Sequence, residues 1–198
     1  THGPLELESF GLPLVLPDGR AVTGFDRSII TILPAELDAP PTVVEGTEGF
    51  RAFDLDDGTG LVLIGAASGR VGLLDTETAS VRYLESADGV LSAGAFAHDG
   101  TRVAVYSVTD GIQIIDVASG RRIGLPMAVP RVQVNNRHIT WAEDNSGVWI
   151  ATAEGPMRFA AITARWRDVA CDIVNRELTT DEWRTFVSDT EPQVTACS

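Results

Sequence analysis

The chain has 198 residues, of which 44% are hydrophobic, so it is long and apolar enough to bury the core of about one domain. Its 15 basic residues are all arginines and are outnumbered by 28 acidic residues, which gives a net charge of −13. This balance argues against nucleic-acid binding, because contacts with phosphates need a cationic face. The lack of lysine excludes a Schiff-base lysine and a P-loop lysine.

No stretch of the chain approaches the roughly 18 consecutive apolar residues of a membrane-spanning helix. The sequence also lacks a charged segment followed by an apolar one, the pattern of a signal peptide. We therefore expect a cytoplasmic protein that makes no contact with a membrane.

The first predicted pair of strands covers residues 21–25 and 29–33. The dipeptide Asp18-Gly19 supplies a turn before the pair, and residues 26–28 separate the two strands. Both segments contain β-branched residues and are bounded by turn residues, which is typical of short strands.

A repeat of about 42 residues follows this pair. Residues 53–76 and 96–117 share one order of features: an aromatic residue, an Asp-Gly turn, an apolar run, a turn with glycine, and a second apolar run that ends in aspartate. The matching pairs are Asp57 and Asp99, Gly58 and Gly100, and Gly69 and Gly111, each 42 residues apart. Short strands with this period predict an all-β fold built from four-stranded β-propeller blades.

The last unit is predicted to have three strands, at residues 138–143, 148–153 and 157–162. A helical period starts directly after the third strand, where a fourth would be expected. Natural sheets cover their open edges, because unpaired edges invite association. We therefore expect the missing strand to come from upstream of Thr1 or from another polypeptide. Within the chain, only residues 5–10 could serve.

The period changes after this unit, so we divide the chain into propeller blades at 1–162 and a C-terminal extension at 163–198. An apolar stripe at helical spacing predicts the first of two helices in the extension. The stripe consists of Ile162, Trp166, Val169, Ala170, Ile173 and Val174. A second helix is predicted over 180–187. It opens with a capping box, in which Thr179 and Glu182 accept each other's main-chain N–H.

The extension contains two tryptophans and two cysteines, for which the sequence suggests a degree of burial and a redox state. Trp166 and Trp183 should be largely buried, because both belong to the apolar faces of the predicted helices. Cys171 and Cys197 are the two cysteines of the chain, too few for the disulfide framework of a secreted protein. The sequence leaves open whether they are free thiols or form one disulfide.

The repeats resemble WD-repeat β-propeller blades of a degenerate kind. In that family the third strand ends in Trp-Asp, whereas here the pairs are Leu74-Asp75 and Ile115-Asp116. The Gly-His pair that precedes a blade in that family is absent. The resemblance covers residues 8–162 and implies four blades, which is fewer than the about seven blades of a complete ring.

The extension resembles the C-terminal tail of WD-repeat proteins found in actinobacterial signalling chains. The matching stretches are Ala170-Cys171, Arg176–Trp183 and Thr195–Cys197. In such proteins the propeller follows a STAND-type ATPase, a kinase or a transcriptional regulator. The resemblance therefore implies a bacterial multidomain signalling protein, in which a partner protein or another part of the same polypeptide completes the propeller.

No group of residues has the spacing of a catalytic or metal site. The three histidines, His2, His98 and His138, are far apart in sequence and lack a third ligand. The run Asp54–Gly58 lacks the glycine and glutamate positions of a calcium loop, so we interpret it as a solvated hairpin turn. A G-x-S-x-G elbow is also absent. We therefore expect no catalytic residue, no metal and no cofactor.

These observations predict a non-catalytic protein-interaction or ligand-sensing domain. Binding is expected at the B–C turns, which join the second and third strands of each blade, where they meet the connections between blades. The predicted contact residues are Arg27, Arg70, Asp110 and Glu154. Two alternatives remain open: a propeller enzyme with its active site at a channel mouth, and a structural lid that keeps an upstream ATPase inactive.

Overall fold

The computed structural model describes residues 13–24, 29–36, 38–129, 138–152, 155–161, 176 and 179–182. The chain divides into two units, Thr1–Phe159 and Ala160–Ser198. Among the described residues, no helix is long and apolar enough to cross a membrane.

The described residues form fifteen strands in four sheets, which we call blades 1 to 4 in chain order. Blade 1 holds β1 (Leu14–Val15), β2 (Ala21–Thr23), β3 (Thr31–Leu33) and β4 (Thr42–Val43). Blade 2 holds β5 (Phe50–Asp56), β6 (Leu61–Ala66), β7 (Val71–Asp75) and β8 (Ser80–Tyr83). Blade 3 holds β9 (Leu91–Phe96), β10 (Arg102–Ser107), β11 (Gly111–Asp116) and β12 (Arg122–Met127). Blade 4 holds β13 (Ile139–Trp141), β14 (Gly147–Thr152) and β15 (Gly155–Ala160).

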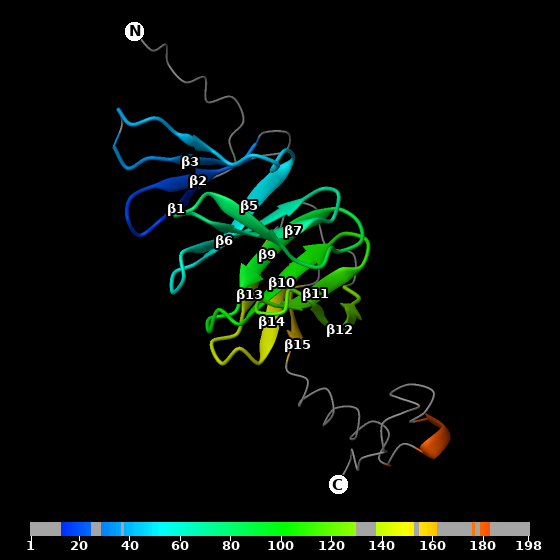
Figure 1. Cartoon of the computed structure of the whole chain (residues 1–198). Coiled ribbons are helices and arrows are strands. Elements are labelled where there is room, and N and C mark those ends of the chain that lie inside the picture. The colour runs from blue at the N-terminus through cyan, green and yellow to red at the C-terminus, as the bar shows by residue number, and fades with distance from the viewer. Residues whose placement is uncertain are drawn as a thin grey trace. The chain divides into compact units, whose positions relative to one another are not determined.

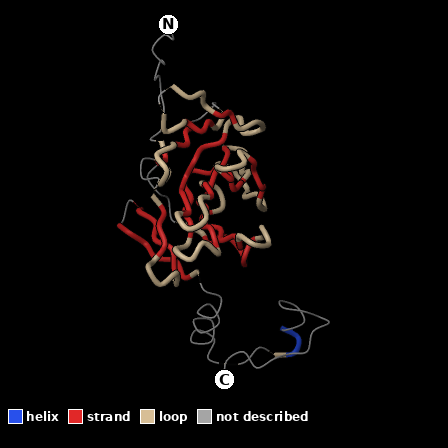
Figure 2. The backbone as a smooth tube through the Cα atoms, turned by 60° about the vertical axis from the view of Figure 1, so that its left-hand side comes forward, coloured by secondary structure: helices blue, strands red, loops and turns tan. Residues whose placement is uncertain are grey.

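Strands that are neighbours in the chain are also neighbours in each sheet, so every blade is a simple meander (Figure 1). Strands joined by short loops dominate the described part of the first unit (Figure 2). This confirms the predicted all-β fold with blade-like sheets. Blade 4 has three described strands, and residues 1–12 and 162–175 lie outside the described part. The source of its fourth strand therefore stays a prediction.

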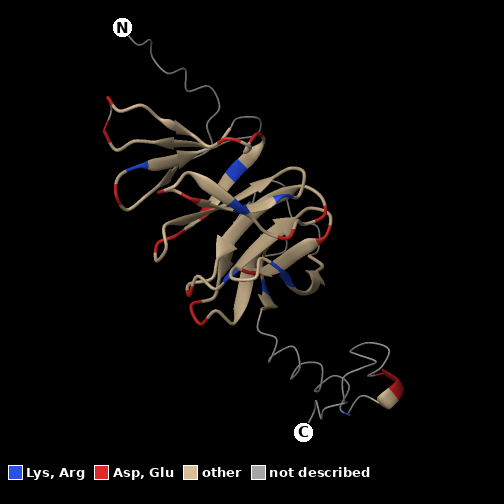
Figure 3. Cartoon of the chain, in the orientation of Figure 1, with Lys and Arg blue, Asp and Glu red and all other residues tan. Residues whose placement is uncertain are grey.

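An aspartate shapes the turn between the first and second strands of every blade. Oδ1 of Asp18, Asp99 and Asp144 accepts the main-chain N–H two residues later, at 2.9, 3.0 and 3.0 Å respectively. In blade 2, Asp56 accepts the Gly58 N–H at 3.2 Å. These Asx turns depend on local sequence alone, so an Asp-Gly pair marks the turns of blades 1 and 3, whereas Asp56 precedes the Asp57-Gly58 pair in blade 2 and Asp144 precedes an asparagine in blade 4. Many Asp and Glu residues accordingly lie in turns (Figure 3).

The aspartates that end the third strands shape the next turn. Oδ1 of Asp75 accepts the N–H groups of Glu77 and Thr78, at 2.8 and 3.1 Å. Oδ1 of Asp116 accepts from the N–H and the hydroxyl of Ser119, at 2.7 and 2.6 Å. The aspartate of the WD-like pairs therefore fixes the path into the fourth strand.

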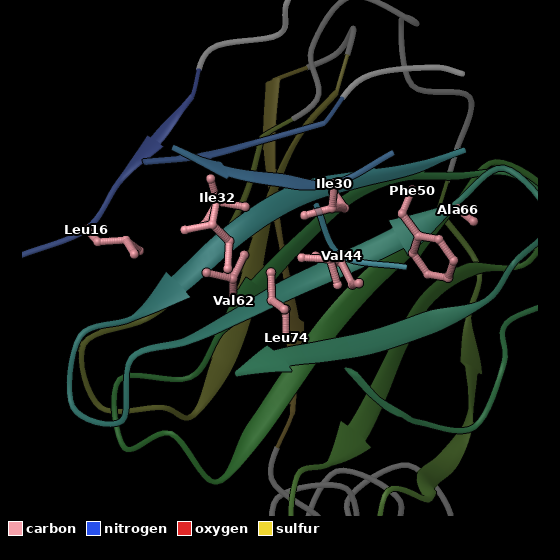
Figure 4. Packing of buried hydrophobic residues seen from close by; sticks show 10 residues of the cluster. Leu16, Ile30, Ile32, Val44, Phe50, Val62, Ala66 and Leu74 are labelled. Atoms are coloured by element: carbon pink, nitrogen blue, oxygen red, sulfur yellow. The ribbon is translucent and has the colours of Figure 1, made fainter. Parts of the chain in front are cut away.

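Apolar side chains fill the spaces between successive blades. One cluster joins blades 1 and 2 and consists of Leu16, Val22, Ile30, Ile32, Val44, Phe50, Val62, Ile64, Ala66 and Leu74 (Figure 4). Another joins blades 2 and 3 and consists of Leu63, Val71, Leu73, Leu84, Ala87, Leu91, Phe96, Val103, Val105 and Ile115. Full burial of one such aliphatic side chain contributes roughly 1.5–3 kcal/mol, so these clusters are the main source of stability.

The position of a residue in the second strand decides which neighbouring blade it meets. In β6, Val62 and Ile64 belong to the cluster with blade 1, whereas Leu63 between them belongs to the cluster with blade 3. In β10, Val103 and Val105 belong to the cluster with blade 2. Successive side chains of a strand point to opposite faces. Each blade thus has a backward face, toward the preceding blade, and a forward face, toward the next.

Hydrogen bonds also attach blade 3 to the connection from blade 2 and to blade 4. The main-chain N–H and the Nε of Arg122 donate to the Glu85 carboxylate, at 2.9 and 2.7 Å. Trp141 Nε1–H in blade 4 donates to the Ala95 carbonyl in blade 3, at 3.0 Å. The Trp141 bond crosses between two sheets, so it resists sliding of blade 4 against blade 3.

The third strand of the first unit begins later than predicted. Residues 29–33 were expected to be extended, but β3 starts at Thr31. The Ile30 N–H donates to the hydroxyl of Thr47, at 2.9 Å, rather than to a neighbouring strand. A side chain seventeen residues away thus replaces a ladder bond, which local periodicity does not reveal.

In the second unit, residues 180–182 form a helical turn that confirms the predicted capping box. The Glu182 N–H donates to Thr179 Oγ1 at 3.3 Å, and the Thr179 N–H donates to Glu182 Oε2 at 2.9 Å. Hydrogen bonds from Arg176, at 2.7 and 2.8 Å, lower the pKa of Glu182 to about 2. The rest of the two predicted helices lies outside the described residues, together with Trp166, Trp183, Cys171 and Cys197.

Candidate interaction surface

The B–C turn of blade 2 presents Arg70 as an exposed cation. Its guanidinium carbon lies 4.7 Å from the ring centre of Phe50 and 6.0 Å from that of Tyr83. The Tyr83 hydroxyl donates to the Gly46 carbonyl at 3.1 Å, which ties the ring to the segment that enters blade 2. Tyr83 nevertheless stays 49% exposed. The aromatic rings therefore orient the guanidinium while it faces solvent.

The connection from blade 2 to blade 3 runs along two B–C turns. The Ala87 N–H donates to the Gly69 carbonyl in the B–C turn of blade 2, at 2.9 Å. The buried hydroxyl of Ser107, the last residue of β10 before the B–C turn of blade 3, donates to the Asp88 carbonyl. The same hydroxyl oxygen accepts the Thr109 N–H at 3.2 Å. These hydrogen bonds attach the connection to the B–C turns of both blades.

Glycine is required where the connection passes the turn of blade 2. Gly69 has a φ of +85°, and a Cβ built there would lie 2.0 Å from the Ala87 carbonyl oxygen. Gly111 repeats this in blade 3, with a φ of +90° and the Met127 carbonyl oxygen at 2.1 Å. A side chain would both strain the backbone and push the connection away. The spacing of these glycines in the sequence therefore reflects close backbone packing.

Two valines in the connection and the B–C turn of blade 3 are exposed to solvent. Val90 in the connection is 47% exposed and Val108 in the B–C turn is 62% exposed. The Val108 N–H donates to the Val90 carbonyl at 3.2 Å, so the two residues are adjacent. We name the B–C surface by its five members, Arg70, Tyr83, Val90, Val108 and Asp110. It combines apolar, aromatic and charged groups at one end of blades 2 and 3.

Asp110 is held at the edge of the B–C surface by a buried amide. Gln113 is 2% exposed, and its Nε2 donates to Asp110 Oδ2 at 3.4 Å. The Gln113 Oε1 has no hydrogen-bond partner within the described part of the chain. The Asp110 N–H also donates to the Ser107 hydroxyl at 3.4 Å. The carboxylate is thus oriented by the turn and by the third strand of its own blade.

The predicted contact residues fall partly on this surface. Arg70 and Asp110 lie in the B–C turns of neighbouring blades, as expected, and Arg27 and Glu154 lie outside the described residues. Sequence reasoning missed Tyr83, Val90 and Val108 as surface members, because isolated apolar residues at strand ends resemble core residues. The signal that could have found Val108 is its place inside a turn, two residues before Asp110.

A hollow of about 960 Å³ lies at the opposite end of the blades. It is bordered by the first strands of blades 2, 3 and 4 and by the turns that follow β5 and β9. Its ionisable lining consists of Asp54, Asp56, Asp57, Asp99, Asp116, His98 and His138. Carboxylates and histidines at a channel mouth are what the enzyme alternative requires. Sequence reasoning did not foresee this hollow, because its residues come from strands and turns of three blades.

Most of these carboxylates have structural partners. Asp54 Oδ2 accepts the Phe96 N–H at 2.7 Å and so links blades 2 and 3, and burial raises the pKa of Asp54. The prediction that Asp54 belongs to a solvated turn is therefore wrong. Asp54 lies in β5, and its bond to the Phe96 N–H holds it between two blades. Asp56, Asp99 and Asp116 shape turns, as described above. In the part of the chain that is described, no three His, Cys, Asp or Glu residues are placed to hold a metal ion.

Comparison with known proteins extends the description of the fold. No family model and no curated protein matches the sequence. Among solved structures, 685 chains are similar, so the architecture is widespread and does not by itself indicate a function. One of them, hydrazine synthase from Kuenenia stuttgartiensis, superimposes with a TM-score of 0.62 at 14% sequence identity. The match covers 81% of this chain and 48% of that chain, so this chain spans about half the length of the solved structure.

Proposed function

We propose that the chain is a non-catalytic protein-interaction module, a WD-type propeller segment of a bacterial signalling protein that binds a partner protein through the B–C surface. One observation carries this proposal. Tyr83, Val90 and Val108 are 49%, 47% and 62% exposed and gather near the exposed Arg70 at one end of blades 2 and 3.

The composition of the B–C surface supports protein binding. Tyrosine and arginine are enriched at the energetic centres of protein interfaces, where an apolar contact is combined with directed hydrogen bonds. Val90 and Val108 add apolar area beside them. Asp110 at the edge supplies an acceptor for a donor on the partner, as polar rims do.

The hydrogen bonds within the two B–C turns and the connection between them also support binding. The Ala87–Gly69 and Val108–Val90 main-chain bonds and the Ser107 network hold the two turns before any partner arrives. A surface that is already ordered loses less conformational entropy on binding. The affinity per contact is correspondingly higher than for a mobile loop.

The net charge supports a partner of opposite sign. At −13 the chain attracts a surface that carries lysine and arginine, which raises the rate of encounter at low salt. We therefore propose that the partner presents an apolar patch with a cationic rim.

The test is affinity capture with matched variants of the full chain. The immobilised chain, an Arg70→Ala, Val108→Asp double variant and an Asp57→Asn control are exposed to extracts of bacteria that encode the protein. Asp57 is exposed and belongs to the opposite end of the blades, so its replacement leaves the B–C surface unchanged. Far-UV circular dichroism and melting temperature establish that all three chains are folded.

The proposal predicts a protein that the wild type and the control retain and the double variant loses. With that protein purified, calorimetry should give a dissociation constant at least about tenfold weaker for the double variant, the effect of removing an interface centre. Equal retention by the double variant, loss by the control, or no retained protein would each contradict the proposal.

A further inference from the structure

The guanidinium of Arg70 is supported by aromatic rings and donates no hydrogen bond to any described residue. The rings of Phe50 and Tyr83 have their centres 6.0 Å apart and are tilted by 45° to each other. Phe50 is 0% exposed and so forms a fixed support. A guanidinium that lies over a ring keeps its N–H groups free at the edges of its plane. Arg70 is therefore held in place without using its donors.

Comparable arginines of blade 3 are bound to acceptors of the protein itself. Arg102 also lies over an aromatic ring, but it donates to the Asn145 carbonyl at 3.2 Å. Arg122 donates to the Glu85 carboxylate at 2.7 Å. These bonds use guanidinium donors within the fold. The donors of Arg70, on an exposed side chain, remain available to a ligand.

A carboxylate is the anion that fits Arg70. The parallel N–H groups of a guanidinium match the two oxygens of a carboxylate. Sites for phosphorylated residues combine several arginines, whereas Arg70 is the one cation among the five members of the B–C surface. The exposed Asp88 lies in the adjoining connection, and the whole chain carries a net charge of −13. A singly charged group therefore suits this site better than a doubly charged phosphate.

The blade 3 side of the B–C surface carries the opposite charge. Asp110 lies in the B–C turn of blade 3, two residues after Val108. Its Oδ2 accepts from Gln113, whereas its Oδ1 accepts no hydrogen bond from a described residue. The connection that carries Val90 passes from the turn of Arg70 to the turn of Asp110. The exposed valines thus belong to a surface with a cation in one blade and an anion in the next.

We propose that the partner docks a segment that places a carboxylate on Arg70, an apolar side chain on the two exposed valines and a cation at Asp110. This inference rests on the proposed function and adds the order of charges, acidic toward blade 2 and basic toward blade 3. The reverse order would bring like charges together at both turns. The two charges therefore set the direction in which the segment docks.

Random linear peptides displayed on phage serve as the probe. They are selected on the immobilised full chain, and the strongest binder is synthesised with a fluorescent label. Fluorescence anisotropy then gives its dissociation constant for the wild type and for Arg70→Gln, Arg70→Glu, Val108→Asp and the control Arg121→Glu. Arg121 is exposed in the turn that follows β11, at the other end of that strand from the B–C turn. Circular dichroism establishes that every variant is folded.

The selected peptides should carry an acidic and a basic residue on either side of an apolar one. Arg70→Gln should weaken binding at least about tenfold and Arg70→Glu further, because the latter places like charges together. Arg121→Glu should change it little. Replacement of the acidic residue of the peptide by arginine should weaken binding to the wild type and restore part of the binding to Arg70→Glu.

The outcomes separate this inference from the proposed function. Binding that Val108→Asp removes and Arg70→Glu leaves unchanged would overturn the carboxylate contact and keep the B–C surface. Equal losses from Arg70→Glu and Arg121→Glu would also overturn it, since a general effect of charge would explain them. A selection that yields no binding peptide, or binding that Val108→Asp does not affect, would contradict the proposed function itself.

Discussion

Trp141 anchors blade 4 to blade 3, so its replacement tests how firmly the last blade is held. The side chain is 4% exposed, and its Nε1–H donates to the Ala95 carbonyl at 3.0 Å. The guanidinium carbon of Arg102 lies 5.0 Å from its ring centre. Trp141→Ala removes the ring, the hydrogen bond and the cation–π contact together. Trp141→Phe keeps an aromatic ring and removes the N–H donor.

The two substitutions should differ in magnitude. Removal of a buried aromatic side chain costs about 3–5 kcal/mol of the free energy of unfolding, which is our expectation for Trp141→Ala. For Trp141→Phe we expect about 1–3 kcal/mol, because the Ala95 carbonyl, on a buried residue, would lose its donor. In a domain of this size each kcal/mol corresponds to about 2–4 °C in melting temperature.

The assay is urea unfolding followed by far-UV circular dichroism. Leu125→Ala is the control, because that side chain is 87% exposed and its removal should change stability by no more than about 0.5 kcal/mol. If Trp141→Ala costs less than about 1 kcal/mol, or no more than the control, the ring does not hold the two blades together and the description of this contact is wrong.

Three further predictions concern a glycine and two carboxyl groups. Gly69→Ala should destabilise the chain by more than about 1 kcal/mol in urea unfolding, because its Cβ would meet the Ala87 carbonyl at 2.0 Å. Gly155→Ala should cost less, since no described atom lies within 4 Å of a Cβ there; equal losses would contradict this reasoning. Burial raises the folded-state pKa of Asp54, so the wild type should lose stability relative to Asp54→Asn as pH rises from about 4 through that raised pKa. Urea unfolding at pH 4 and pH 7 measures this, and a difference that is constant or of opposite sign would refute it. The Arg176 hydrogen bonds hold the pKa of Glu182 at about 2, so the capping contact should be intact above about pH 4 and disappear as pH falls toward 2. A carboxyl titration by NMR should give that midpoint, and Arg176→Ala should raise it; a wild-type midpoint near 4 would show that the contact is not formed.

Local features of the fold could be predicted from the sequence because local chemistry decides them. The Asx turns at Asp18 and Asp99 need a carboxylate and the N–H two residues later, and an Asp-Gly pair marks each of them in the sequence. The capping box of Thr179 and Glu182 is local in the same way. The apolar runs predicted the strands of the inner blades, because both faces of such a blade are buried and successive residues are therefore apolar.

Features that join distant residues could not be predicted in the same way. The hydrogen bond from the Phe96 N–H to Asp54 spans 42 residues, and it turns a carboxylate of an apparent surface turn into a link between blades. The hollow beside it collects side chains from strands and turns of several blades, so no single stretch reveals it. The sequence placed Arg70 and Asp110 in B–C turns because turn residues between two apolar runs are visible locally. Val90 required the path of the connection, which depends on packing across blades.

Photo-cross-linking inside cells tests interaction through the B–C surface most directly. A benzoyl-phenylalanine is placed at Val108 in one form of the full chain and at Asp57 in another, and cells of a bacterium that encodes the protein are irradiated. The proposal predicts one protein adduct from position 108, lost when Arg70→Ala and Tyr83→Ala are combined with it, and no such adduct from position 57. An adduct from position 57 alone, or none from position 108, would contradict it.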